Sequence, residues 1–169
     1  VVIVSDTGAI VTSTLTFEYL SGSAISGVTP NVGQEGTRVV IAGARFYGGG
    51  SSIVSVSLVG VSANIENHTD SQVIVTAGSK VTGGLGDIVL LSDSGALTTQ
   101  LNGFTYNVAG AVSVVQPSSG QYGTRVTING TSLRGSGASV ASVTLGGVVA
   151  NIISQNDSLV VVEAGIGPN

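Results

Sequence analysis

Hydrophobic and polar positions alternate along this chain in short segments that are separated by turns rich in glycine. In residues 38–42, for example, Val39 and Ile41 share one face, which is the period-two pattern of a half-buried strand. No helical periodicity lies between such segments, so the pattern predicts an all-β, two-sheet sandwich. The strands of one unit are predicted over residues 24–28, 38–42, 53–58, 61–65, 72–76, 87–91 and 98–106, the last two as a closing hairpin.

One predicted strand has an irregular phase. In residues 53–58 the alternation predicts that Val54, Val56 and Leu58 share one face, with Ile53 out of phase.

The whole pattern recurs after 87 residues without a gap. Phe17 and Tyr19, for example, recur as Phe104 and Tyr106. Two periods would need 174 residues, five more than the chain has. The phase of the repeat therefore predicts three parts: the closing strands of a sandwich over 1–20, a complete domain over 24–107, and an incomplete domain lacking its last two strands over 111–169.

Composition and charge exclude several function classes. With 5 basic and 9 acidic residues the net charge is −4, which offers no footprint for a nucleic-acid backbone. The chain has no cysteine, so disulfides, thiolate metal sites and cysteine nucleophiles are absent. No apolar run is long enough to span a membrane. The chain begins with Val1 and has no methionine, so we expect a removed targeting segment or a longer parent protein.

The sequence offers no catalytic constellation. His68 is the single histidine, so neither a Ser/His/Asp set nor a histidine metal site can be assembled around it. Acidic residues such as Glu35, Asp70 and Asp87 are scattered and form no ligand-spaced loop. We therefore expect a protein that is not an enzyme, with no cofactor, no metal and no small-molecule ligand.

The turn and core residues resemble those of a known domain family. The pattern runs from Val28-Thr-Pro through Gly33, Gly36 and Val39 to a closing Phe104-Thr-Tyr. This pattern is similar to the IPT/TIG domain, an immunoglobulin-like sandwich. The resemblance implies tandem modules in extracellular receptors and adhesins. Other branches of the family supply accessory domains of glucanotransferases and domains of transcription factors. The excess of acidic over basic residues argues against the DNA-binding branch.

The incomplete domain lacks four to five core side chains of a closing hairpin. Each is worth roughly 1.5 to 3 kcal/mol, on the order of 10 kcal/mol in sum, against a whole-domain stability of about 5 to 15 kcal/mol. We therefore expect residues 111–169 to recruit strands from elsewhere. The expected donor residues are Val2, Val4, Ile10, Phe17 and Tyr19. The expected acceptor core is Val126, Ile128, Val143, Leu145, Val160 and Val162.

Donation from one identical chain to the next, head to tail, does not close on itself and generates a filament. The main hypothesis is therefore a structural subunit of an extracellular filament, a homopolymer. The alternative is an adhesion or ligand-binding segment of a long tandem-repeat cell-surface protein, with the flanking strands covalently continuous. An accessory domain of a carbohydrate-active enzyme is a third hypothesis.

Three sequons support an extracellular or cell-surface location. Asn67, Asn129 and Asn156 each begin an Asn-x-Ser/Thr triplet and are N-glycan candidates. We expect Asn129 to point outward at the end of a strand, and Asn67 and Asn156 to lie in loops. N-linked glycans would also help to keep a surface with so few charges soluble.

Overall fold

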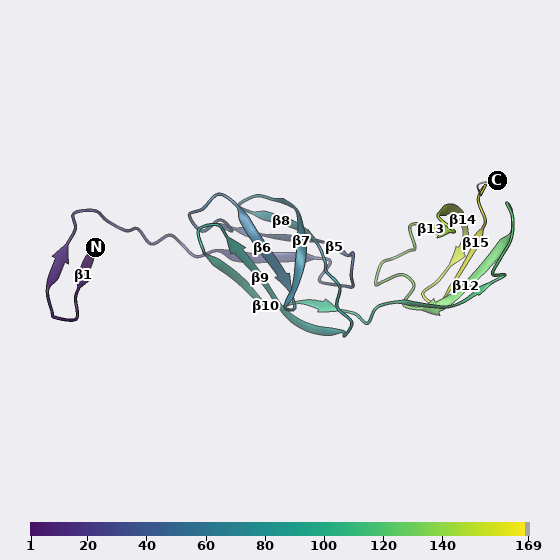
Figure 1. Ribbon diagram of the computed structural model, residues 1–169, viewed down its shortest axis with the longest axis horizontal. Helices are drawn as coiled ribbons and strands as arrows, with labels where there is room; N and C mark the ends of the chain where they lie inside the picture. The colour runs from purple at the N-terminus through teal and green to yellow at the C-terminus, as the bar shows by residue number, and fades with distance from the viewer. Residues whose placement is uncertain (168–169) are drawn as a thin grey trace.

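The computed structural model describes residues 1–167, which form strands and turns without a helix (Figure 1). The predicted all-β class is therefore confirmed. The strands belong to three sheets of two, eight and five strands, which follow one another along the chain. No helix long and apolar enough to cross a membrane occurs among these residues.

Residues 24–106, here called the complete module, form a two-layer sandwich. Its strand order is β3-β5-β8-β7-β6-β9-β10-β4. Strand β7 joins the two layers, because its first residues pair with β6 and its last residues pair with β8. The strands are β3 (Ala24–Thr29), β4 (Val32–Gly33), β5 (Arg38–Ala44), β6 (Ile53–Leu58), β7 (Val61–His68), β8 (Gln72–Thr76), β9 (Gly84–Ser92) and β10 (Leu97–Tyr106).

The core of the complete module lies between the two layers. Period-two alternation along β5 buries Val39 and Ile41, as predicted. The closing hairpin β9–β10 adds Ile88, Leu90, Phe104 and Tyr106 from the opposite layer. Strand β5 and the closing hairpin thus each supply buried side chains to one core, which is why the sandwich needs its last two strands.

Strand β6 differs from the sequence prediction. Its pairing with β9 shifts register between Ile53 and Ser55, so a bulge moves one residue out of the alternation. Ile53 is consequently 5% exposed and Val54 is 54% exposed. The prediction that Val54 shares a face with Val56 and Leu58 was wrong, because the extra residue exchanges the two faces ahead of Val56.

Residues 111–167, here called the open module, repeat only the first part of this arrangement. Their strand order is β11-β12-β15-β14-β13, which corresponds to β3-β5-β8-β7-β6 after the shift of 87 residues. The strands are β11 (Ala111–Gln116), β12 (Arg125–Thr131), β13 (Val143–Leu145), β14 (Val148–Gln155) and β15 (Leu159–Glu163).

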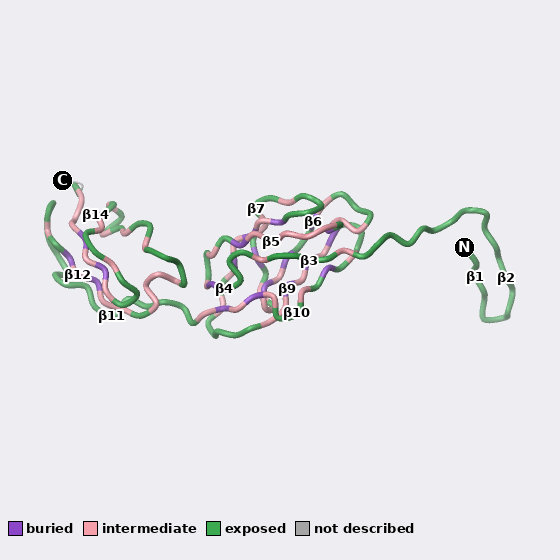
Figure 2. Tube along the Cα trace, turned by 180° about the vertical axis from the view of Figure 1, so that it is seen from behind, coloured by how far each residue is buried: buried purple, intermediate pink, exposed green. Residues whose placement is uncertain are grey.

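Residues 1–20, here called the N-terminal hairpin, form a separate antiparallel pair of β1 (Val2–Val4) and β2 (Ile10–Thr12). Figure 1 shows this hairpin on one side of the complete module and the open module on the other. Figure 2 shows that the whole hairpin is exposed. It therefore buries none of its apolar residues against either module.

The two modules meet at a junction with two polar contacts. The Gly110 N–H donates to the Gln34 side-chain oxygen, Oε1, at 3.1 Å. The Asn107 side-chain amide donates to the Ser136 hydroxyl. Residues 107–110 join the two modules, which lie end to end (Figure 1).

Candidate functional site: the open core of the second module

The open module has one unpaired edge next to its core. Strand β13 pairs with β14 on one side and has no partner on the other side among residues 1–167. The equivalent strand β6 pairs with both β7 and β9. The backbone groups on one edge of β13 are therefore available to another strand.

The expected acceptor residues lie on two sides of an incomplete core. Val126, Ile128, Val160 and Val162 are buried together with Ala150. Val143 and Leu145 pack against this cluster but are only half-buried. Their equivalents in the complete module, Val56 and Leu58, are fully covered. The difference arises because β9 and β10 cover that side of the complete module.

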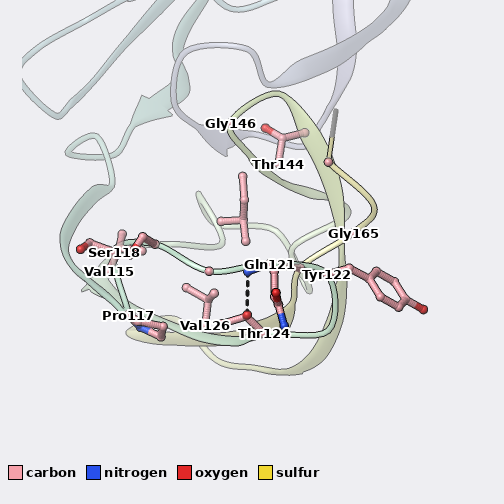
Figure 3. Close-up of a pocket in the computed structure, with 15 residues that line it drawn as sticks. Val115, Pro117, Ser118, Gln121, Tyr122, Thr124, Val126, Thr144, Gly146 and Gly165 are labelled. Atoms are coloured by element: carbon pink, nitrogen blue, oxygen red, sulfur yellow. Dashed lines mark hydrogen bonds between the residues drawn. The ribbon is translucent and has the colours of Figure 1, made fainter. Parts of the chain in front are cut away.

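A hollow of about 390 Å³ opens beside this core (Figure 3). The Gln121 N–H donates to the Thr124 hydroxyl at 2.9 Å and closes the turn at its rim. Tyr122 points away from the hollow in Figure 3 and is largely exposed. The lining includes Val115, Pro117, Gly120, Val126, Leu145 and Gly165.

In the complete module, Tyr106 lies next to the equivalents of two glycines that line the hollow. The Thr105–Tyr106 segment runs parallel to β4, and the N–H of Asn107 donates to the Gly33 carbonyl at 2.7 Å. Burial raises the pKa of the Tyr106 hydroxyl, and the backbone of Gly78 partly opposes that shift. Gly33 and Gly78 correspond to Gly120 and Gly165, which line the hollow. The hollow therefore has the position of a missing tyrosine.

The N-terminal hairpin has the pairing of that missing hairpin. Val2 pairs with Thr12 and Val4 with Ile10, and the equivalent pairs in β9–β10 are Val89 with Thr99 and Leu91 with Leu97. The turn is also the same. Ser5 N–H donates to the Ala9 carbonyl at 2.9 Å, as Ser92 N–H does to Ala96 at 3.0 Å.

The aromatic pair at the end of the hairpin is preserved as well. The rings of Phe17 and Tyr19 meet edge to face at 5.0 Å, and those of Phe104 and Tyr106 do so at 5.2 Å. Their surroundings differ completely: Phe17 and Tyr19 are 71% and 90% exposed, whereas Phe104 and Tyr106 are 0% and 1% exposed. The N-terminal hairpin thus has the internal geometry of a closing hairpin without a core to cover.

The complete module indicates which residues of this hairpin would face a core. Ile88 and Leu90 are buried in β9, while the intervening Val89 and the following Leu91 are half-buried on the outer face. If the hairpin covered a core in the same way, the 87-residue shift would place Val1 and Ile3 inward. The expected donors Val2 and Val4 would then lie on the outer face, because a slip of one residue exchanges the two faces.

The second strand of the hairpin has its equivalent in β10. Thr98 is buried and Leu97 is exposed in β10. By the same equivalence, Val11 would lie inward and the expected donor Ile10 outward. Phe17 and Tyr19 would lie inward, as Phe104 and Tyr106 do in the complete module.

The sequons occupy three different settings. Asn67 is exposed but lies within β7, where it pairs with Ile74, so the expected loop position was wrong. Asn129 lies in the interior of β12 and is half-buried. Asn156 lies in the turn before β15, and its Oδ1 accepts from the N–H groups of Ser158 and Leu159, both at 2.8 Å.

Two of the ionisable groups, Asp93 and His68, have structural partners. The pKa of Asp93 falls to about 2, chiefly because the Ser51 hydroxyl and N–H donate to its carboxylate at 2.8 and 2.9 Å. His68 contacts the Tyr47 hydroxyl at 3.2 Å between Nδ1 and Oη. Among residues 1–167, no three His, Cys, Asp or Glu residues cluster as metal ligands would.

Several solved structures match this chain, and the fold is shared with the extracellular region of plexin A4. The full extracellular region of plexin A4 matches in two crystal forms, with TM-scores of 0.58 and 0.52, at 19% and 17% identity. These matches cover 86% and 96% of this chain but only 13% and 18% of the plexin chains. The Bacteroides ovatus glucan-utilisation protein SGBP-B in complex with a mixed-linkage heptasaccharide matches with a TM-score of 0.40 at 17% identity, over 86% of this chain and 36% of its own.

No curated protein sequence matches the chain. The sequence model of the IPT/TIG domain, however, matches residues 23–106 and 111–169, which together make up most of the chain. The resemblance drawn from the turn and core residues is thereby confirmed, and the chain belongs to the IPT/TIG domain family.

Proposed function

We propose that this chain is a non-catalytic interaction segment of an extracellular protein built from tandem modules, and that it binds β-strands of another polypeptide in its open module. The observation that carries the proposal is the unpaired edge of β13 next to an incomplete core. The similarity to the plexin A4 extracellular region supports an extracellular or cell-surface location, as the sequons also do.

The open module combines the two features that strand addition requires. Its β13 edge offers unpaired backbone donors and acceptors, which supply affinity when a strand is added. The half-buried Val143 and Leu145, together with the hollow beside them, supply contact sites for alternate side chains of the incoming strand.

The charge of the chain favours a ligand recognised by shape and apolar contact. With 5 basic and 9 acidic residues in 169, there is little charge to steer a highly charged partner. The lining of the hollow contains no charged side chain. A neutral strand with an aromatic residue therefore suits this surface better than an anionic polymer does.

A synthetic peptide with the sequence of residues 84–106 of this chain is a suitable probe, because it carries the closing hairpin that the open module lacks. We expect the full chain to bind it and the backbone amides of β13 to gain hydrogen-exchange protection. Leu145→Arg should abolish the binding, while Val54→Arg, on the exposed face of β6, should leave it unchanged. Binding that is equal in the two variants, or absent in the wild type, would refute the proposal.

A second candidate is the structural subunit of a head-to-tail filament. The observation that favours it is the N-terminal hairpin, whose register and aromatic pair equal those of β9–β10. Imaging of the native particle tests it. Fibres that give a band near 16.6 kDa on a denaturing gel, or above it when glycosylated, support separate subunits. Isolated globules, or a single very large chain, would exclude this candidate.

A further inference from the structure

We propose that the occupant of the open module is the N-terminal hairpin of a second copy of this chain, held in the register that β9–β10 take in the complete module. The inference rests on the proposed function and names the partner of the open core. It also names the residues that each copy contributes.

Within one copy, the N-terminal hairpin and the open module lie on opposite sides of the complete module, so the proposed donor is another copy (Figure 1). Figure 1 places the N-terminal hairpin on one side of the complete module and strands β12 to β15 on the other. The complete module has its own closing hairpin, β9–β10, so it offers the N-terminal hairpin no place in its core. The hairpin of one copy and the open module of the next are then complementary halves of one sandwich.

The pairing between copies follows from the complete module. There Val56 pairs with Leu90, Ser57 with Val89 and Leu58 with Ile88. Shifting both strands by 87 residues pairs Val143 with Ile3, Thr144 with Val2, and Leu145 with Val1 of the second copy. Ile3 and Val1 then cover the half-buried Val143 and Leu145.

The aromatic end of the hairpin fits the hollow. In the complete module the N–H groups of Thr105 and Asn107 donate to the carbonyls of Asn31 and Gly33, at 2.9 and 2.7 Å. The equivalent donors in the second copy are Glu18 and Leu20, and the equivalent acceptors are Ser118 and Gly120. Those two bonds place the Tyr19 ring in the hollow, at the position that Tyr106 has in the complete module.

The turn of the hairpin gains partners in the same complex. The Asp93 carboxylate accepts from the N–H groups of Ser51 and Ser52, at 2.9 and 3.2 Å. Asp6 occupies the equivalent turn, and the equivalent donors are the N–H groups of Ala138 and Ser139. These bonds need only backbone donors, so the change from Ser51 to Ala138 does not remove the N–H bond.

Engineered disulfides test the register. The chain has no native cysteine, so only the introduced cysteines can form disulfides. Residues that face each other in antiparallel strands lie about 4.5–5.5 Å apart between Cα atoms, within the range a disulfide spans. In the full chain, Val2→Cys with Thr144→Cys should give a ladder of covalent oligomers under mild oxidation. Ser57→Cys with Val89→Cys is the matched control and should close within one chain.

A shifted pair tests whether the contact is specific. Val2→Cys with Val143→Cys places the two thiols on opposite faces of the sheet and should give little ladder. The proposal is overturned if the matched pair gives no ladder while the Ser57/Val89 control closes. It is equally overturned if the shifted pair forms a ladder as efficiently as the matched pair.

A second measurement addresses the aromatic contact. Tyr19→Ala should weaken self-association of the full chain, followed by sedimentation velocity, by tenfold or more. Leu101→Ala removes a side chain that is 71% exposed on β10 and should change nothing. Equal association of the two variants would contradict the placement of Tyr19. Binding of the 84–106 peptide without a matched ladder would refute only this choice of partner and leave the proposed function standing.

Discussion

At the scale of single residues, the repeat keeps glycine where a strand passes close to its neighbours. A Cβ on Gly43 would collide with the Ala24 carbonyl oxygen and with the ring of Phe46, which is buried. Gly130 has the same relation to Ala111 and Leu133 in the open module. The two equivalent glycines therefore have a packing reason in both modules.

Gly43→Ala should destabilise the complete module by about 1–3 kcal/mol, because the Phe46 ring and strand β3 must move to admit the methyl group. Chemical denaturation followed by tyrosine fluorescence measures the loss. Gly27→Ala is the control, since a Cβ there meets nothing within 4 Å. Equal losses for the two variants would show that the close approach is unimportant.

Asp93 gives the complete module an acid-sensitive turn. Its folded-state pKa of about 2 lies below the ordinary value of 3.8. The contribution of its carboxylate to the stability of the fold is therefore present above pH 3.8 and is lost as the pH falls through 2. Asp93→Asn should therefore flatten the fall of Tm between about pH 4 and pH 2. Glu66, whose pKa is also lowered, chiefly by the Thr76 hydroxyl, leaves part of that fall in place.

Asp6→Asn is the matched control for this measurement, because Asp6 lies in the equivalent turn of the exposed hairpin. It should leave the pH dependence of Tm in the dilute chain unchanged. A profile for Asp93→Asn that superimposes on the wild type would contradict the assigned role of the Asp93 turn.

The sequons form a graded series of glycan acceptors. Asn67 is exposed on β7, whereas Asn129 is half-buried within β12. We expect Asn67 to be occupied in the native protein and Asn129 to be unoccupied or nearly so. Asn67→Gln should then remove a mass increment that mass spectrometry of the intact chain detects, and Asn129→Gln should not. The reverse pattern would contradict this ordering.

At the scale of elements, two hairpins with one geometry have different surroundings. Phe104→Ala should cost about 3–5 kcal/mol, because its ring is fully buried in the core. Phe17→Ala in the dilute chain should change stability by less than about 0.5 kcal/mol, because its ring is 71% exposed. Equilibrium unfolding at low concentration measures both. Comparable losses would mean that the N-terminal hairpin is already packed against a module.

The elements also show how much of the fold can be predicted from the sequence. Simple alternation located Val39 and Ile41 in the core, and the turn residues identified the family. The phase of Val54 was missed because a bulge adds one residue without a marker in the alternation. The faces of Val2 and Val4 stay a prediction: Val1 to Val4 are all apolar, so only the buried Ile88 and Leu90 of the complete module indicate which face would turn toward a core.

The hollow in the open module is the feature that the sequence does not show. Its lining combines residues of β11, β12 and β13 with the turn around Gln121 and the segment that follows β15, which the fold brings together. The 87-residue repeat alone does not show which side chain of the complete module lies at the equivalent place. The structure is needed to identify that side chain as Tyr106.

At the scale of the whole molecule, the contact at the junction bears on the angle between the complete module and the open module. The Gln34 side chain accepts from the Gly110 N–H at 3.1 Å and is the side chain of the complete module that reaches the linker. Gln34→Ala should broaden the distribution of angles between the modules. Small-angle X-ray scattering should then show a less extended average shape, while Gln121→Ala, at the equivalent position of the open module, should leave the dilute chain unchanged. An identical scattering profile for Gln34→Ala would show that the linker alone sets the angle.

The N-terminal hairpin and the open module lie on opposite sides of the complete module and are unlike in chemistry. A polymer joined through them would have polarity: one tip would display a hairpin with exposed aromatic rings, and the other an unpaired sheet edge. The two tips would grow at different rates. A peptide equivalent to the hairpin would cap one tip and leave the other active, which offers a way to control fibre length from a single direction.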